Sequence, residues 1–150
     1  MVKIRTMLAD EAETVLTLWN ENCLEAAGRS LGPDELAQVL KLLLQYAAHN
    51  HAFCFVAESK TELVGFITGY LISHPVLASF SGEIEELYVQ PQSRHLGIGA
   101  KLVESAVNSM RSLGASTIRV GADVSSHSAK EFWRHLGWSN DLTIFSQDNV

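Results

Sequence analysis

The stretch YVQPQSRHLGIGA, residues 88–100, decides the fold. A β-rich run, Glu83–Val89, leads into a loop with one arginine and two glycines, and an amphipathic helix follows at once. The start of a helix offers unpaired N–H groups and a partial positive charge, which suits an anion. Gly97 and Gly99 let the backbone approach a phosphate closely. Arg94 can bind a diphosphate with two parallel hydrogen bonds, so the stretch predicts a phosphate-binding strand–loop–helix.

Other phosphate-binding motifs do not fit this stretch. The sequence has no G-x-x-x-x-G-K-[ST] loop. A dinucleotide G-x-G-x-x-G motif fails because Leu102 holds the third glycine position, and only about fifty residues follow, too few for a doubly wound nucleotide domain. The pattern that remains is [RQ]-x-x-G-x-[GA], from Arg94 to Gly99.

Hydrophobic spacing outward from this stretch predicts further helices and strands. Six strands are expected, at Val2–Met7, Phe53–Glu58, Leu63–Ile72, Glu83–Val89, Thr117–Ala122 and Leu142–Phe145. Four helices are expected, starting at Asp10 with Glu13 in capping-box spacing, at Pro33, near Ile98, and at Ser126 or Ser128. The segment from His74 to Gly82 is expected to be a loop. The order β-α-α-β-β-β-α-β-α-β predicts one α/β domain over residues 1–150, a mixed sheet with helices on its faces.

Composition narrows the class of protein further. Of 150 residues 47% are hydrophobic, which excludes intrinsic disorder. The net charge of −6 argues against nucleic acid and against an anionic membrane surface as partners. No signal peptide and no apolar run long enough to span a bilayer is visible, so we expect a cytoplasmic protein. Two cysteines make no disulfide framework, and six histidines without ligand spacing give no metal site.

Taken together, the motif and the element order resemble the GNAT N-acetyltransferase superfamily. The motif at Arg94–Gly99 is similar to the family's acyl-CoA pyrophosphate loop. Residues 126–138, SHSAKEFWRHLGW, are similar to its N-x-x-A-x-x-F-Y-x-x-x-G-F segment. Two positions depart from that segment, because Ser126 replaces the usual asparagine and Trp133 the usual tyrosine. The resemblance implies a mostly antiparallel central sheet with helices on both faces, and a homodimer as a family-level expectation.

The resemblance also implies acetyl-CoA as co-substrate and a set of residues that bind it. In the family the strand corresponding to Glu83–Val89 splays from its neighbour, and the pantetheine arm pairs with its backbone, a form of strand addition by a ligand. A strand N–H near Leu87 would stabilise the developing oxyanion. The implied coenzyme-binding residues are Leu87, Tyr88, Val89, Arg94, His95, Leu96, Gly97, Ile98, Gly99, Ala100, Ser126 and Trp133.

Acetyl transfer to an amine requires the amine to lose a proton. An alkylamine with a pKa of about 10.4 is almost wholly protonated at pH 7, so a carboxylate base is useful. Glu85 is the first candidate and Glu83 the second, because they match base positions of polyamine-type and histone-type members. Strict alternation places Glu86 on the opposite face from both, and we expect Glu86 and Trp19 to contact the acceptor.

Trp133 cannot act as the general acid that the family's tyrosine often supplies. Ser126, His127 or water are the alternatives, and a thiolate with a pKa near 8.5 can leave with little acid help. Two functions therefore remain open. One is an acetyl-CoA-dependent enzyme that acetylates a primary amine of a polyamine, an aminoglycoside-like molecule, another small amine or a protein. The other is a non-catalytic acyl-CoA-binding domain, suggested by the two departures.

Overall fold

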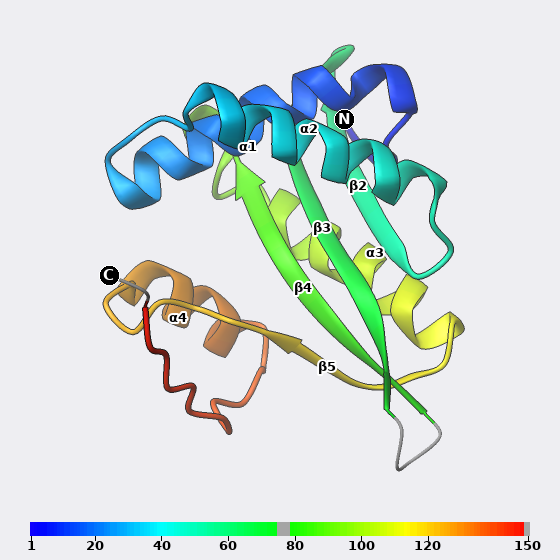
Figure 1. Ribbon diagram of the computed structural model, residues 1–150, viewed down its shortest axis with the longest axis vertical. Helices are drawn as coiled ribbons and strands as arrows, with labels where there is room; N and C mark the ends of the chain where they lie inside the picture. The colour runs from blue at the N-terminus through cyan, green and yellow to red at the C-terminus, as the bar shows by residue number, and fades with distance from the viewer. Residues whose placement is uncertain (75–78, 149–150) are drawn as a thin grey trace. The chain divides into compact units, whose positions relative to one another are not determined.

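The computed structural model describes residues 1–74 and 79–148, which divide into two compact units, Met1–Val120 and Gly121–Val150. The first unit holds a five-stranded sheet in sequence order (Figure 1). Its strands are β1 (Val2–Thr6), β2 (Ala52–Ser59), β3 (Glu62–His74), β4 (Ser79–Val89) and β5 (Ala115–Val120). The first four are antiparallel, and β5 runs parallel to β4. The mixed, mostly antiparallel sheet is therefore confirmed.

Helices cover both faces of this sheet. Helices α1 (Ala12–Ala27) and α2 (Pro33–Ala48) pack on one face, and α3 (Ile98–Ser112) passes behind β3 and β4 in Figure 1, on the other face. Helices α1 and α2 bury apolar side chains against strand residues that include Phe66; these side chains are Val15, Leu18 and Leu43. Burying each such side chain contributes about 1.5–3 kcal/mol, and this core fixes α1 over β3 and β4.

A β-bulge interrupts the pairing of β3 with β4. Thr68 pairs with Glu86, but the next residue, Gly69, pairs with Ile84, so Glu85 is the extra residue of β4. Gly69 has no side chain, and a Cβ there would collide with the Glu83 carbonyl oxygen and the Phe53 ring. The bulge therefore depends on a glycine in the neighbouring strand.

Several predicted boundaries in the first unit are wrong. Strand β5 spans Ala115–Val120 and not Thr117–Ala122, because its pairing with β4 starts at Ala115 and ends at Val120.

Helix α1 is preceded by a 3-10 turn, Ala9–Glu11, and Glu11 rather than Glu13 accepts the hydrogen bond from a backbone N–H, that of Leu8 at 2.8 Å. Arg5 binds both carboxylate oxygens of Glu11, at 2.7 and 2.8 Å, and holds this cap in place.

The expected loop from His74 to Gly82 is also too long. Strand β3 extends to His74 and β4 begins at Ser79, because the paired strands continue the ladder through residues of low β propensity. Residues 75–78, which belong to the expected loop, lie outside the part of the chain that the structure describes.

The second unit contains α4 (His127–His135). Ser126 caps this helix, as predicted, because its hydroxyl accepts the Ala129 N–H at 3.4 Å. Trp133 is buried, with its ring 4.8 Å from that of Trp138. The predicted strand Leu142–Phe145 is absent: residues 139–148 form no helix or strand, and a strand needs a partner that no segment of residues 121–148 supplies. The remaining predicted element order is confirmed.

Candidate active site

The pairing of β4 with β5 stops before β4 ends. Val120, the last residue of β5, pairs with Ile84, and β4 continues through residues 85–89. The Gln90 N–H donates to the Val64 carbonyl at 2.8 Å, so backbone groups of even-numbered residues here face β3. The backbone of Leu87 and Val89 therefore faces the β5 side of β4, where the family resemblance implies that the pantetheine arm pairs.

The predicted phosphate-binding loop follows this strand at once. A 3-10 turn, Pro91–Ser93, leads to His95 and Gly97, whose φ angles are +64° and +81°. Helix α3 begins at Ile98, and none of the described side chains caps it. The first intrahelical bond runs from the Lys101 N–H to the Gly97 carbonyl. The N–H groups of residues 98–100 thus have no partner within the helix, which fits an anionic group such as a diphosphate.

Arg94 joins this loop to helix α1. Its Nε donates to the Val89 carbonyl at 2.8 Å, and its Nη2 lies 2.7 Å from a carboxylate oxygen of Glu25. The guanidinium also lies over the Tyr88 ring, 5.6 Å from the centroid. The ion pair lowers the pKa of Glu25 below its ordinary value. Arg94 therefore braces the end of β4 and is only partly free for a ligand.

The bulge changes the faces predicted for the β4 glutamates. Paired residues share a face, so Glu86 lies with Thr68 and Glu83 with Tyr70, on the face covered by α1 and α2. The Glu85 carboxylate accepts hydrogen bonds from Thr68 and from Tyr46 of α2, which places it on the same face. The prediction that Glu86 points away from Glu83 and Glu85 is wrong, because the extra residue resets the alternation.

Glu83 and Glu86 are both half-buried, and Glu86 is bonded to helix α1. The Asn22 side-chain amide donates to its carboxylate at 2.7 Å. Burial raises the pKa of Glu86 above its ordinary value, the Asn22 hydrogen bond lowers it, and the negative charge of Glu85 raises it. A carboxyl group with a raised pKa is better matched to accept a proton at neutral pH.

Glu85 is exposed and is held by two hydroxyl groups. Tyr46 Oη donates to its Oε1 at 3.1 Å and Thr68 Oγ1 at 3.3 Å. The pKa of Tyr46 is raised, mainly by burial and then by the neighbouring Glu85.

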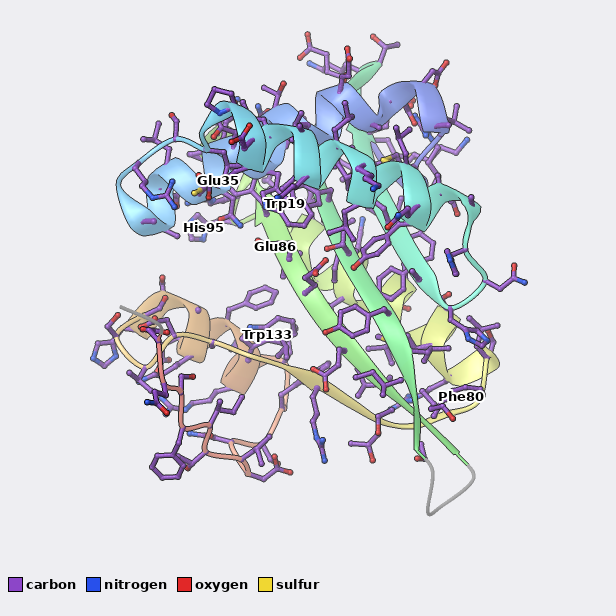
Figure 2. All side chains as sticks on the ribbon, in the orientation of Figure 1. Trp19, Glu35, Phe80, Glu86, His95 and Trp133 are labelled. Atoms are coloured by element: carbon purple, nitrogen blue, oxygen red, sulfur yellow. The ribbon has the colours of Figure 1, made fainter. Side chains whose placement is uncertain are left out.

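Several predicted and unpredicted residues meet at this face. Trp19 stacks on Phe66, with ring centroids 5.8 Å apart, and lies one turn from Asn22 on α1; Figure 2 labels Trp19 and Glu86. Sequence reasoning missed Tyr46 and Thr68. For Thr68 the signal in the sequence is a hydroxyl group inside an otherwise apolar strand. For Tyr46 there is no such signal.

Ser126 and Trp133 lie in the second unit, as the cap and the buried aromatic residue of α4. Within the described ranges, no three His, Cys, Asp or Glu side chains are grouped to hold a metal ion. None of the described helices is long and apolar enough to cross a membrane.

Comparisons with known proteins agree with this geometry. The chain is 27% identical over 122 residues to an aminoalkylphosphonate N-acetyltransferase of Salmonella typhimurium, which covers 75% of this chain and 79% of the relative. A predicted acetyltransferase from Clostridium acetobutylicum, solved with acetyl-CoA, has a TM-score of 0.83 at 16% identity, covering 99% of this chain and 96% of its own. An aminoglycoside acetyltransferase from an uncultured soil sample, solved with sisomicin, has a TM-score of 0.79 at 20% identity, covering 99% and 97%.

The profile of the Acetyltransferase (GNAT) family matches residues 13–138, which is most of the chain and includes parts of both units. Together with the N-acetyltransferase relative, this match favours the enzyme over the non-catalytic acyl-CoA-binding domain. The chain belongs to the GNAT acetyltransferase family and is an acetyl-CoA-dependent N-acetyltransferase.

Proposed function

We propose that the chain, acting over residues 1–150 as one catalytic domain, transfers acetyl directly from acetyl-CoA to the primary amine of a small cationic molecule. The observation that carries this proposal is the position of three carboxylates, Glu83, Glu85 and Glu86, on the helix-covered face of β4 where its pairing with β5 ends. A cationic amine would be attracted to this face, and its ammonium would find a carboxylate to take its proton.

The proposed reaction balances without any further reactant. The amine nitrogen attacks the thioester carbonyl carbon, an N–C bond forms and the C–S bond breaks. One proton leaves the ammonium before attack and another leaves the nitrogen after it, while the coenzyme thiolate takes up one proton. The N–H of Leu87 faces the β5 side of β4 and, in this proposal, donates to the oxyanion that develops on the carbonyl oxygen.

In this proposal two glutamates act on the acceptor amine, each in a different role. Glu86 is the candidate base, because it is half-buried and its pKa is raised. Glu85 is exposed and is oriented by Tyr46 and Thr68, which suits a carboxylate that binds the charged acceptor. The sequence alone ranks Glu85 first as the candidate base, so this assignment reverses that ranking.

The acceptor class follows from charge. The Salmonella relative is named for an aminoalkylphosphonate, an acceptor that carries an anionic group. Among the described residues, two cations lie near these carboxylates: Arg94 is already paired with Glu25, and Arg119 of β5 is the sheet neighbour of Glu83 on the same face, so one positive charge stands against three negative ones. Three carboxylates on one face repel a phosphonate, so we propose a diamine, a polyamine or an amino sugar as the acceptor.

Trp133 stands where the family usually has a tyrosine. This replacement fits the proposed mechanism if water reprotonates the coenzyme thiolate. An indole N–H is not a usable acid, but a thiol pKa near 8.5 lets the thiolate leave unaided. We also keep the homodimer and the cytoplasmic location as predictions. Sedimentation analysis of the purified protein tests the first of them.

Two-substrate kinetics test the proposal. Initial rates of coenzyme thiol release are measured over a matrix of acetyl-CoA and spermidine concentrations, with the product identified by mass spectrometry. Direct transfer predicts intersecting double-reciprocal lines and an acetylated amine, and Glu86→Gln should lower kcat by about 10²- to 10⁴-fold, as for a lost general base. Parallel lines would contradict direct transfer, and an unchanged rate in Glu86→Gln would remove its role as base.

A further inference from the structure

Thr68 is the buried polar side chain of the described core. Its side chain is completely shielded from solvent, and it lies in the middle of β3 opposite the bulge of β4. A hydroxyl in such a place costs free energy unless it is hydrogen-bonded. Valine has nearly the same shape and no hydroxyl, so packing alone gives no reason for threonine here.

The Thr68 hydroxyl makes one hydrogen bond to each residue of the bulge. Its oxygen accepts the Glu86 N–H at 3.2 Å, and its hydrogen is donated to Oε1 of Glu85 at 3.3 Å. A hydroxyl has a single hydrogen, and the Glu86 N–H occupies a lone pair on the other side. The direction of the chain of bonds is therefore fixed, from the Glu86 N–H through Thr68 to the Glu85 carboxylate.

This arrangement links the backbone of one glutamate to the side chain of the other. Tyr46 donates to the same oxygen of Glu85 from α2, at 3.1 Å. The Glu85 carboxylate is exposed and would otherwise rotate among several rotamers. Two donors that converge on one oxygen, one from the core and one from a helix, restrict it to a single orientation.

We infer that Thr68 is a positioning residue for acetyl transfer, whose hydroxyl fixes the bulge and aims the Glu85 carboxylate at the acceptor amine. The inference rests on the proposed function, because it needs the helix-covered face of β4 to be the acceptor side. Thr68 itself touches no reactant and acts through Glu85 and Glu86. Its loss should therefore affect the use of the amine and leave the binding of acetyl-CoA unchanged.

Three threonine variants test this role in the full chain. Thr68→Val removes the hydroxyl and keeps the shape, Thr68→Ser keeps the hydroxyl, and Thr17→Val makes the same change on α1, where the Thr17 hydroxyl is exposed and bonds the Glu13 carbonyl. Thr68→Ala replaces the valine variant if that one does not fold. For each variant we would measure kcat and KM for spermidine, the Kd of acetyl-CoA, and the Tm.

Thr68→Val should lower kcat/KM for the amine by about 10- to 150-fold, the loss expected for a hydrogen bond to a charged group. Thr68→Ser should recover most of that loss, and Thr17→Val should match the unmodified chain. The Kd of acetyl-CoA should stay within twofold in all three variants.

Equal kcat/KM in Thr68→Val and the unmodified chain would overturn the positioning role and leave the proposed function standing. A serine variant as poor as the valine variant would also overturn it, because the hydroxyl would then not be the cause. If the unmodified chain acetylates no amine while it binds acetyl-CoA, the proposed function fails, and the inference fails with it.

Discussion

Replacing Arg94 by alanine should weaken the binding of acetyl-CoA while the chain stays folded. Arg94 makes a hydrogen bond of 2.8 Å to the Val89 carbonyl and an ion pair of 2.7 Å with Glu25, and its side chain is 35% exposed. Exposed ion pairs contribute about 0–1 kcal/mol, so the loss of the Glu25 contact should cost little stability. A charged hydrogen bond to the diphosphate should contribute about 1.5–3 kcal/mol, which predicts a Kd about 10- to 150-fold higher.

Isothermal titration of acetyl-CoA at fixed salt measures this change, and Glu25→Gln is its matched control. The Glu25 carboxylate holds the guanidinium and would repel a diphosphate, so its neutral replacement should tighten binding by about 2- to 5-fold, in the range of an exposed ion pair. If Arg94→Ala weakens the binding of acetyl-CoA and Glu25→Gln strengthens it, Arg94 is identified as a coenzyme ligand. An unchanged Kd in a folded Arg94→Ala variant would refute the assignment of the loop.

Three further predictions concern residues around the site. Asn22→Leu removes a hydrogen bond that lowers the pKa of Glu86, so the acid limb of the kcat/KM–pH profile should move to higher pH; a shift to lower pH would contradict the assignment of Glu86 as base. Burial raises the pKa of Glu86, so its charge opposes folding at neutral pH. Glu86→Gln should therefore raise the Tm at pH 7 and do so much less at pH 4, where the carboxyl group is mostly protonated in both states; an equal effect at both pH values would argue against burial as the cause. Gly69→Ala should destabilise the chain by about 1–3 kcal/mol in urea titration through collision with Phe53 and the Glu83 carbonyl, whereas an unchanged midpoint would show that the bulge can shift.

The sequence predicts the strand–loop–helix well because its signals are local. Pro91 ends the strand ladder, the left-handed conformation at Gly97 favours a glycine, and the helix stripe begins at Ile98. Each of these signals is read from a residue and its immediate neighbours. The strand, loop and helix expected from them are therefore present at the predicted positions.

The faces of the glutamates could not be predicted, because the bulge is not local to β4. Alternation assumes one residue per step, and the extra residue at Glu85 is set by Thr68 and Gly69 of β3. Nothing within residues 83–89 marks that shift. The correct grouping of the β4 carboxylates requires knowledge of the strand pairing.

Tyr46 was missed because the C-terminal end of α2 buries a different side from the expected one. The sequence predicts an apolar stripe at Leu36, Leu40, Leu43, Leu44 and Ala47. Leu43 is fully buried as expected, but Leu44 and Ala47 are exposed, and Tyr46 is half-buried in their place. The predicted strand Leu142–Phe145 failed for a related reason. Its β propensity is strong, but propensity produces a strand only where another strand is available to pair with it.

The relative use of two matched acceptors tests the central claim most directly. Propane-1,3-diamine and 2-aminoethylphosphonate have amines on similar short chains and opposite charges at the other end. At saturating acetyl-CoA, the carboxylates of β4 should give the diamine at least about tenfold higher kcat/KM, since two charges about 5 Å apart interact by about 3 kcal/mol at an effective dielectric constant of 20 and about 1.4 kcal/mol suffices. Equal values, or a preference for the phosphonate, would contradict a site selective for cationic amines.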